Sequence, residues 1–137
     1  MTTRDRRGFD YARHMAEMSD YNRVHIGCVI MIGNKVVSTG FNTQKSHPLQ
    51  KHYNQFRDFD GSNISIDSLH AEMSALIPLK NSGADLSKAR MYVYRTRKDI
   101  QHGMCRPCPG CMAAIKSLGI KDVYYTTNDG LVHEIIN

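Results

Sequence analysis

The sequence contains no long apolar run. Its 137 residues nowhere approach the roughly 20 consecutive apolar positions that a helix needs to cross a bilayer. No continuous apolar run follows the basic first residues either, so we expect neither a membrane span nor a secretory signal. Internal repeats, low-complexity tracts and linkers rich in glycine, serine or proline are also absent. With a hydrophobic share of 41%, the sequence predicts one soluble domain over residues 1–137, located in the cytoplasm and without membrane partners.

Acidic residues are fewer than basic ones. Eighteen lysines and arginines against 13 aspartates and glutamates give a net charge of +5 when histidine is neutral. Such an excess favours an anionic partner, either a nucleotide phosphate or a nucleic-acid backbone. A solvated basic surface has the same composition, so the charge alone does not choose a partner.

Cysteines are few and unevenly placed. Cys28 stands alone, whereas Cys105, Cys108 and Cys111 fall within seven residues. A disulfide scaffold spreads its cysteines along a secreted chain, and this arrangement does not resemble one. Two cysteines separated by two residues are typical of metal ligands or of a redox pair. An intracellular zinc site is therefore the first hypothesis.

Apolar spacing and turn residues predict five strands and a first helix. We expect a helix over residues 9–21, because apolar residues recur there at spacings of three and four. The expected core-facing stripe comprises Phe9, Tyr11, Ala12, Met15, Ala16 and Met18. The expected strands cover residues 26–32, 35–41, 89–96, 121–127 and 131–136. The turn at 33–34 makes the first two strands a hairpin, and the short turn at 128–130 makes the last two antiparallel.

Two more helices are expected in the second half of the chain. One covers residues 69–79, with Asp67 or Ser68 as its N-cap, and Pro78 should end or kink it. The other begins at Cys108 or Pro109.

The remaining polar segment, residues 42–67, is expected to be a long loop with one helical turn near 49–56. A sheet covered by helices is the simplest way to bury this order of elements. The sequence therefore predicts a layered α/β fold.

Two short motifs carry the chemistry of a metal site. They are His70-Ala71-Glu72 and the segment 107–111, which contains Cys108 and Cys111. A catalytic zinc ion takes three protein ligands and leaves the fourth position open, and one histidine with two cysteines supplies that number. The spacing of the cysteines at a helix start turns both sulfurs toward one point, and the helix N-terminus favours thiolates.

Glu72 is the candidate catalytic residue. It follows His70 by two positions, about 200° around a helix, so the two do not share a helical face, but within the first turn Glu72 can still lie beside such a metal without binding it. A carboxylate placed there can take a proton from water and deliver it to a leaving group. A purely structural zinc site has no need of it.

The two motifs together match the known signature of zinc-dependent nucleobase deaminases, H-x-E followed by P-C-x-x-C. The sequence therefore resembles the cytidine/deoxycytidylate deaminase superfamily. Segments 26–30 and 39–42 and the order of elements also agree with that family. The resemblance implies a three-layer α/β/α sandwich with a five-stranded mixed sheet, and members that assemble as homo-oligomers.

The resemblance also implies the roles of individual residues. His70, Cys108 and Cys111 would bind one Zn²⁺ per chain, and Glu72 would carry protons. The same resemblance places three candidate substrate-binding residues: Asn42 at the sugar, the Ala71 backbone at the pyrimidine carbonyl, and His25 in the pocket wall.

Several of these residues have simpler interpretations. A Cys-x-x-Cys pair alone is compatible with a structural zinc knuckle or a redox pair, and Cys105 forms an equally spaced pair with Cys108. We exclude Cys105 as a ligand because Pro107 precedes Cys108 as in the family pattern, which leaves Cys105 as a possible free thiol at the site. Cys28 is expected in the core. Asn42 is compatible with a residue that caps its own backbone. The remaining candidate histidines are expected to be solvated: His47, His52, His102 and His133.

The substrate is predicted from three features. A histidine ligand is found in the deoxycytidylate, tRNA and polynucleotide branches of the family, and residues 110–125 resemble deoxycytidylate deaminases. Basic residues of the long loop offer partners for one phosphate: Lys45, Lys51, His52 and Arg57. Two features depart from the deoxycytidylate branch. Segment 43–48 stands where those enzymes have a glycine-rich turn with further zinc ligands. The last two strands are expected to be antiparallel, as in nucleoside deaminases.

We therefore expect hydrolytic deamination of a cytosine nucleotide or nucleoside, with a dCMP-type substrate favoured and ammonia released. One alternative is a deaminase acting on single-stranded DNA or tRNA. The backbone of the nucleic acid would then lie along basic residues near the site: Arg95, Arg97, Lys98 and Arg106. Against it, the tyrosines expected in strands are better placed for the core than for stacking on bases: Tyr92, Tyr94, Tyr124 and Tyr125. A non-catalytic zinc-stabilised binding module is the second alternative.

Overall fold

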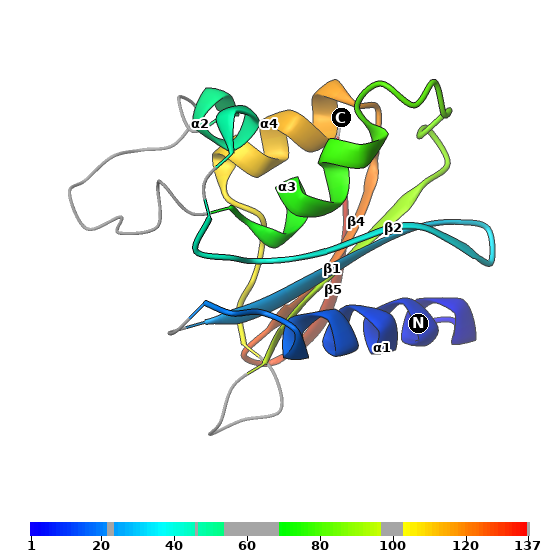
Figure 1. Cartoon of the computed structure of the whole chain (residues 1–137). Helices are drawn as coiled ribbons and strands as arrows, with labels where there is room; N and C mark the ends of the chain where they lie inside the picture. The colour runs from blue at the N-terminus through cyan, green and yellow to red at the C-terminus, as the bar shows by residue number, and fades with distance from the viewer. Residues whose placement is uncertain (22–23, 46, 54–68, 97–102, 137) are drawn as a thin grey trace.

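A five-stranded mixed sheet forms the centre of the protein (Figure 1). The computed structural model describes residues 1–21, 24–45, 47–53, 69–96 and 103–136. The strands are β1 (His25–Ile32), β2 (Lys35–Phe41), β3 (Arg90–Thr96), β4 (Asp122–Thr127) and β5 (Gly130–Ile135). Their order across the sheet is β2-β1-β3-β4-β5. β3 and β4 are parallel, and the other neighbours, including β4 and β5, are antiparallel, as predicted.

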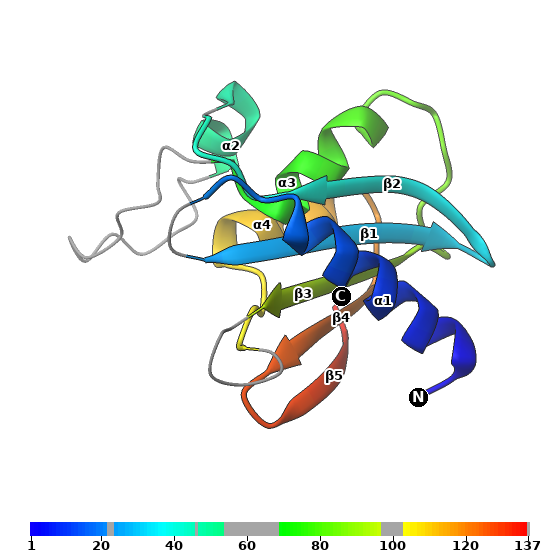
Figure 2. The same ribbon diagram turned by 60° about the horizontal axis from the view of Figure 1, so that its bottom comes forward.

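Helices cover both faces of the sheet, which confirms the predicted three-layer α/β/α sandwich (Figures 1 and 2). α1 (Thr3–Glu17) lies on one face. The other face carries α2 (Pro48–Tyr53), α3 (Ala71–Leu76) with the 3₁₀ turn η2 (Ile77–Leu79), and α4 (Pro109–Ser117). None of the helices in the described ranges is both long enough and apolar enough to pass through a membrane.

The core has one hydrophobic cluster on each face of the sheet. Alternate strand residues point to opposite faces, so Val93 joins the cluster under α3 and α4, whereas Tyr92 joins the cluster under α1. All four tyrosines that were expected in the core are buried there: Tyr92, Tyr94, Tyr124 and Tyr125. Cys28 is also fully buried, as expected.

α1 begins and ends earlier than predicted. A capping box starts the helix, in which the Thr2 hydroxyl accepts from the Asp5 backbone N–H and the Asp5 carboxylate accepts from the Thr2 N–H. The helix ends at Glu17, with Met18 as its C-cap. Two members of the predicted stripe do not face the core, because Tyr11 is 39% and Met18 is 60% exposed.

α3 begins later than predicted. Its N-cap is His70 rather than Asp67 or Ser68, which lie outside the described residues. Leu69 exchanges two backbone hydrogen bonds with Thr43, and this bridge keeps the chain extended up to His70. After Leu76 the α-helix becomes 3₁₀, with Pro78 in that turn, as expected for a proline at this point.

Close packing places α3 on the sheet. A Cβ on Gly40 would lie 2.5 Å from the Ala75 backbone nitrogen and 2.7 Å from the Ala71 carbonyl oxygen. Only glycine therefore allows the α3 backbone to approach β2 this closely. The Ser38 hydroxyl adds a hydrogen bond of 2.6 Å to the Ala75 carbonyl. These contacts fix the position of the helix whose first residues carry the His70 motif.

The other predicted elements are present with shifts of one or two residues. The helical turn expected near 49–56 is α2, which is described as far as Tyr53. The helix expected from Cys108 or Pro109 is α4, with Cys108 as its N-cap.

Candidate functional site

Three side chains from distant parts of the sequence meet where two helices begin. The ligand atoms of His70, Cys108 and Cys111 all lie within 4.8 Å of one another. His70 Nδ1 is 3.6 Å from Cys108 Sγ and 3.4 Å from Cys111 Sγ. The structure thus brings together the three residues that the two motifs single out.

The starts of α3 and α4 orient these side chains. His70 is the N-cap of α3 and Cys108 is the N-cap of α4. The Cys108 sulfur accepts a hydrogen bond of 3.5 Å from the backbone N–H of Cys111, so the turn itself brings the two cysteines together. Pro109 at the start of α4 suits a position whose N–H has no partner in the helix. Both helix starts direct positive dipole ends toward the thiols.

A fully buried glutamine also holds the site. Gln50 of α2 accepts a hydrogen bond of 3.0 Å from the His70 backbone N–H through its Oε1. α3 provides no side-chain cap of its own at this position, so Gln50 takes that role. Sequence reasoning missed Gln50, because one glutamine within a polar segment carries no periodicity or motif.

The two thiols have unequal proton affinities. A hydrogen bond from Cys111 lowers the pKa of Cys108, and His70 lowers it further against the opposing effect of burial. The same bond, together with burial, raises the pKa of Cys111. The pair therefore loses one proton readily, and it loses the second only when a cation balances two adjacent thiolates. One imidazole and two thiols are also the donors that zinc prefers, so this group fits a zinc ion.

Glu72 lies beside this group without belonging to it. Glu72 is only 5% exposed, and Cys111 is one of the groups that lower its pKa. Burial raises the pKa of Glu72, an effect that His70 opposes and Cys108 reinforces. A carboxyl group held in this way exchanges protons closer to neutral pH than an exposed glutamate does.

Cys105 is outside the His70–Cys108–Cys111 group. Its Sγ lies 3.1 Å from Thr126 Oγ1 and 3.4 Å from the Val93 carbonyl oxygen, and burial raises its pKa to about 12. Backbone hydrogen bonds join the same segment to the sheet, from Gly103 to Arg95 and from Cys105 to Thr126. Cys105 thus anchors the segment that leads to Cys108.

Arg106 anchors that segment to the edge strand β5. Its guanidinium donates two hydrogen bonds, of 2.9 and 2.8 Å, to the Glu134 carboxylate. Tyr125 donates a third to the same carboxylate at 2.9 Å. This bonding engages Arg106, which the sequence offered as a residue for a nucleic-acid backbone, with a protein partner.

The candidate substrate residues lie near the ends of the strands and at the start of α3. Asn42 follows β2 and is buried; its Oδ1 accepts from the Ile26 N–H at 2.9 Å and its Nδ2 donates to the Val24 carbonyl at 2.7 Å. One N–H and one lone pair of this amide remain after these bonds. His25 begins β1, and Ala71 is the first residue of α3.

The other basic and histidine candidates do not join the three-residue group within the described part of the chain. Lys45 is exposed, and His52 is exposed with its ring against Tyr53. His47 Nδ1 accepts from the Leu49 N–H, and His133 stacks on Tyr124. The remaining candidates lie outside the described residues or have side chains that do: Lys51, Arg57, Arg97, Lys98 and His102.

Comparison with known proteins gives one family match. The family model described as "Cytidine and deoxycytidylate deaminase zinc-binding region" matches residues 2–127. A search of curated proteins found no match.

Solved structures share the fold at low sequence identity. A dCMP deaminase from the cyanophage S-TIM5 in apo form superposes with a TM-score of 0.64 at 20% identity, covering 93% of this chain and 86% of that chain. The same phage enzyme in complex with dCMP and dUMP gives 0.63 at 21% identity, with coverages of 93% and 84%. A cytidine deaminase from Burkholderia pseudomallei gives 0.63 at 17% identity, with coverages of 98% and 93%.

Proposed function

The chain belongs to the cytidine and deoxycytidylate deaminase family and is a zinc-dependent deaminase, and from this membership we propose that it hydrolyses the cytosine of a nucleotide or nucleoside to uracil, with dCMP-type substrates favoured. The observation that carries the proposal is the meeting of His70, Cys108 and Cys111 beside a buried Glu72. The overall reaction consumes one water and releases one ammonia.

His70, Cys108 and Cys111 are the residues that would hold one zinc ion. Their donor atoms converge, and the two thiols need a cation before both can lose their protons. A zinc ion held by these residues would act as a Lewis acid and would lower the pKa of bound water to about 7.

Glu72 is proposed as the proton carrier. It takes one proton from the attacking water and gives it to the ring nitrogen of the base while the remaining hydroxyl adds to C4. It then takes the proton of that C4 hydroxyl and gives it to the amino group, so that the C–N bond breaks, ammonia leaves and the carbonyl of uracil forms. Its burial and its raised pKa support this role, because a carboxyl group that is readily protonated can both accept and return a proton.

Three residues are proposed to contact the substrate. The N–H and the lone pair that its two backbone hydrogen bonds leave on the Asn42 amide suit a sugar hydroxyl, and these two bonds fix the orientation of the amide. The Ala71 backbone at the start of α3 suits the pyrimidine carbonyl, and His25 at the start of β1 suits the wall of the pocket.

A 5′-phosphate is the favoured substrate feature. The histidine in the donor group and the net charge of +5 support it, and the similar phage enzyme is described in complex with dCMP and dUMP. The antiparallel pairing of β4 and β5 favours the second candidate, a nucleoside without phosphate. Like other members of the family, the chain is also expected to form a homo-oligomer, which light scattering would test.

The decisive experiment is ultraviolet monitoring of cytidine, deoxycytidine, CMP, dCMP and a cytosine-containing single-stranded DNA. We expect the highest kcat/KM on dCMP, and we expect Glu72→Gln to lower kcat by at least about 10²-fold while the zinc content stays the same. A higher kcat/KM on deoxycytidine would favour the nucleoside candidate.

Turnover of the DNA alone, with binding that weakens steeply as salt rises, would favour the polynucleotide candidate. Zinc binding without turnover of any of these substrates would contradict the proposal and favour a non-catalytic zinc-stabilised module.

A further inference from the structure

A cavity of about 530 Å³ lies between the first turn of α1, the β1–β2 turn and the start of β3. Six polar residues from these three segments line it: Thr2, Thr3, Arg4, Arg7, Asn34 and Arg90. We call it the arginine cavity. It lies where β3 begins, whereas the His70–Cys108–Cys111 group follows the ends of β2 and β3. The two sites are therefore at opposite ends of the sheet.

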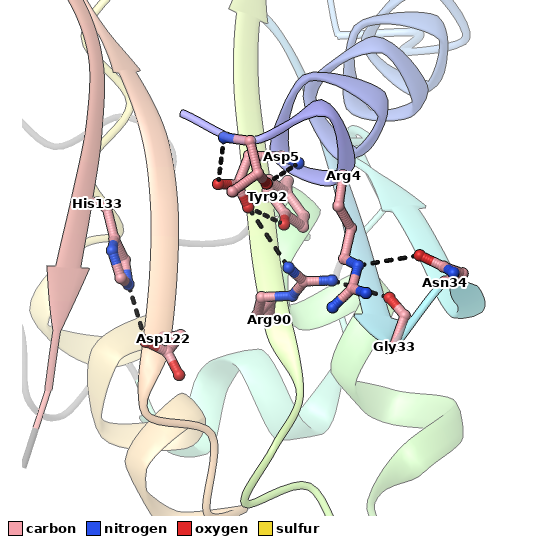
Figure 3. Close-up of polar contacts among 9 residues, drawn as sticks. Arg4, Asp5, Gly33, Asn34, Arg90, Tyr92, Asp122 and His133 are labelled. Carbon is pink, nitrogen blue, oxygen red and sulfur yellow. Dashed lines mark hydrogen bonds and ion pairs between the residues drawn. The ribbon is translucent and has the colours of Figure 1, made fainter.

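Neutral partners hold two of the arginines in place (Figure 3). Arg4 Nε donates to Asn34 Oδ1 at 2.9 Å, and one terminal nitrogen of Arg90 donates to the Gly33 carbonyl oxygen at 2.8 Å. A guanidinium has five N–H groups, so each of these arginines keeps donors for a ligand. Because these hydrogen bonds already orient the two side chains, binding a ligand would cost less side-chain entropy.

The arginine cavity carries more positive than negative charge. Within the described residues, the acid that pairs with a lining arginine is Asp5, whose carboxylate is 3.5 Å from Arg90. Asp5 is buried and also accepts hydrogen bonds from the Tyr92 hydroxyl at 2.6 Å and from the Thr2 N–H at 3.2 Å. Among the described residues, three guanidinium groups against one carboxylate give the arginine cavity a net positive charge.

The start of α1 does not by itself make this site. Thr2 and Asp5 already cap the helix, so the charge that a ligand would meet is that of the arginines. Arg7 is exposed, and its guanidinium donates a hydrogen bond of 3.4 Å to a neutral phenol, the Tyr11 hydroxyl.

The lining selects for phosphate groups. One guanidinium group can donate two parallel hydrogen bonds to the oxygens of a phosphate group. The threonine hydroxyls and the Asn34 amide can donate to the same oxygens. Within the part of the chain that the structure describes, the lining contains no aromatic or large apolar side chain on which a base could stack. The volume lies within the range of about 300–1,000 Å³ found for small-molecule sites. We infer that the arginine cavity binds a polyvalent phosphate anion, in the class of inorganic tripolyphosphate or the phosphate chain of a nucleotide.

Isothermal titration of the full chain with inorganic tripolyphosphate tests this site without using enzyme activity. We expect binding, and we expect Arg4→Gln and Arg7→Gln each to weaken it about tenfold. Arg13→Gln is the matched control, because it removes the same charge from the same helix but pairs with Asp10 and Glu17. It should change the affinity less than twofold.

A second measurement locates the ligand. Amide hydrogen exchange should slow in residues 2–7 and 33–34 when tripolyphosphate is added. A titration with adenosine triphosphate shows whether the ligand is a free polyphosphate or a nucleotide. An affinity equal to that for tripolyphosphate identifies the phosphate chain alone as the ligand. Tighter binding of adenosine triphosphate that still depends on Arg4 and Arg7 identifies a nucleotide. Both results support the site.

Three results would overturn the inference. The first is no tripolyphosphate binding at low salt. The second is an equal loss of affinity in Arg13→Gln, which would show a general charge effect. The third is binding of single-stranded DNA that depends on Arg4 and Arg7 and that tripolyphosphate does not displace, because the ligand would then be a polynucleotide.

Discussion

At the scale of single residues, the site depends on buried polar groups whose partners are in place. Asn42, Gln50 and Glu72 are all buried; Asn42 and Gln50 are hydrogen-bonded to backbone groups around the site, and His70 and Cys108 shift the pKa of Glu72. A buried donor or acceptor that loses its hydrogen-bond partner lowers the free energy of unfolding by about 1–3 kcal/mol, so Asn42 and Gln50 hold their partners in position.

Gln50→Leu should therefore weaken both the fold and the metal site. The substitution leaves the His70 N–H without its acceptor, which should lower the free energy of unfolding by about 1–3 kcal/mol. It should also weaken zinc binding by about tenfold, because the backbone of a proposed ligand loses its support. Chemical unfolding and competition with a zinc chelator measure the two effects. Gln44→Leu, at an exposed position, is the control, and equal effects in both variants would argue against the role of Gln50.

Asp5 should make the stability depend on acid pH. Burial alone would raise its pKa, but hydrogen bonds from Tyr92 and Thr2 and the charge of Arg90 outweigh burial, and the pKa of Asp5 is lowered. Its stabilising contribution is complete above the unfolded-state pKa of about 3.9 and is lost as the pH falls through the lower folded-state value.

Asp5→Asn should lower the free energy of unfolding at pH 7 by about 1–3 kcal/mol and have a smaller effect near pH 3. Urea unfolding at both pH values measures this difference. A penalty of the same size at both pH values would show that the charge of Asp5 contributes little.

At the scale of elements, the placement of α3 on β2 connects the sheet to the site. The helix approaches the strand at Gly40, and the two nearest atoms that a side chain would meet are backbone atoms of Ala75 and Ala71. Backbone cannot rotate away as a side chain can, so any larger residue at this position must move the helix.

Gly40→Ala should therefore displace α3 and with it His70. We expect a loss of about 1–3 kcal/mol in stability and weaker zinc binding. Thr39→Ala, at an exposed position of the same strand, is the control. Thermal unfolding and zinc content measure both effects, and unchanged zinc content in Gly40→Ala would show that α3 does not set the ligand geometry.

Sequence patterns predicted most elements and the metal group, for physical reasons that also explain the failures. His70, Cys108 and Cys111 are recognisable because zinc chemistry fixes both residue type and spacing. The start of α3 was predicted wrongly, because the bridge between Thr43 and Leu69 is a long-range contact that local propensity does not contain. Gln50 was missed for the same reason, since its partner lies 20 residues away.

At the scale of the whole molecule, the proposed zinc ligands lie at the starts of two neighbouring helices, α3 and α4, that come from distant parts of the sequence. Removing zinc should therefore destabilise the complete fold, because a ligand that binds only the folded state adds about 4 kcal/mol when present at a thousandfold excess over its Kd. We expect a chelator to lower Tm by about 10 °C or more and added zinc to restore it.

Cys108→Ser is the matched variant for this measurement. It should unfold at a lower temperature than the unaltered protein, and the chelator should not lower its Tm further. A Tm in the unaltered protein that does not respond to the chelator would contradict a structural contribution of the metal.

The separation between the two ligand segments has a kinetic consequence. His70 and Cys111 are 41 positions apart, and the cysteines begin α4, the crossover helix between the parallel strands β3 and β4. We expect this crossover to form before the cysteines reach His70. Zinc uptake during refolding should therefore follow sheet assembly, with a rate that does not rise with zinc concentration. The rate of zinc uptake would then report the rate of the last stage of folding.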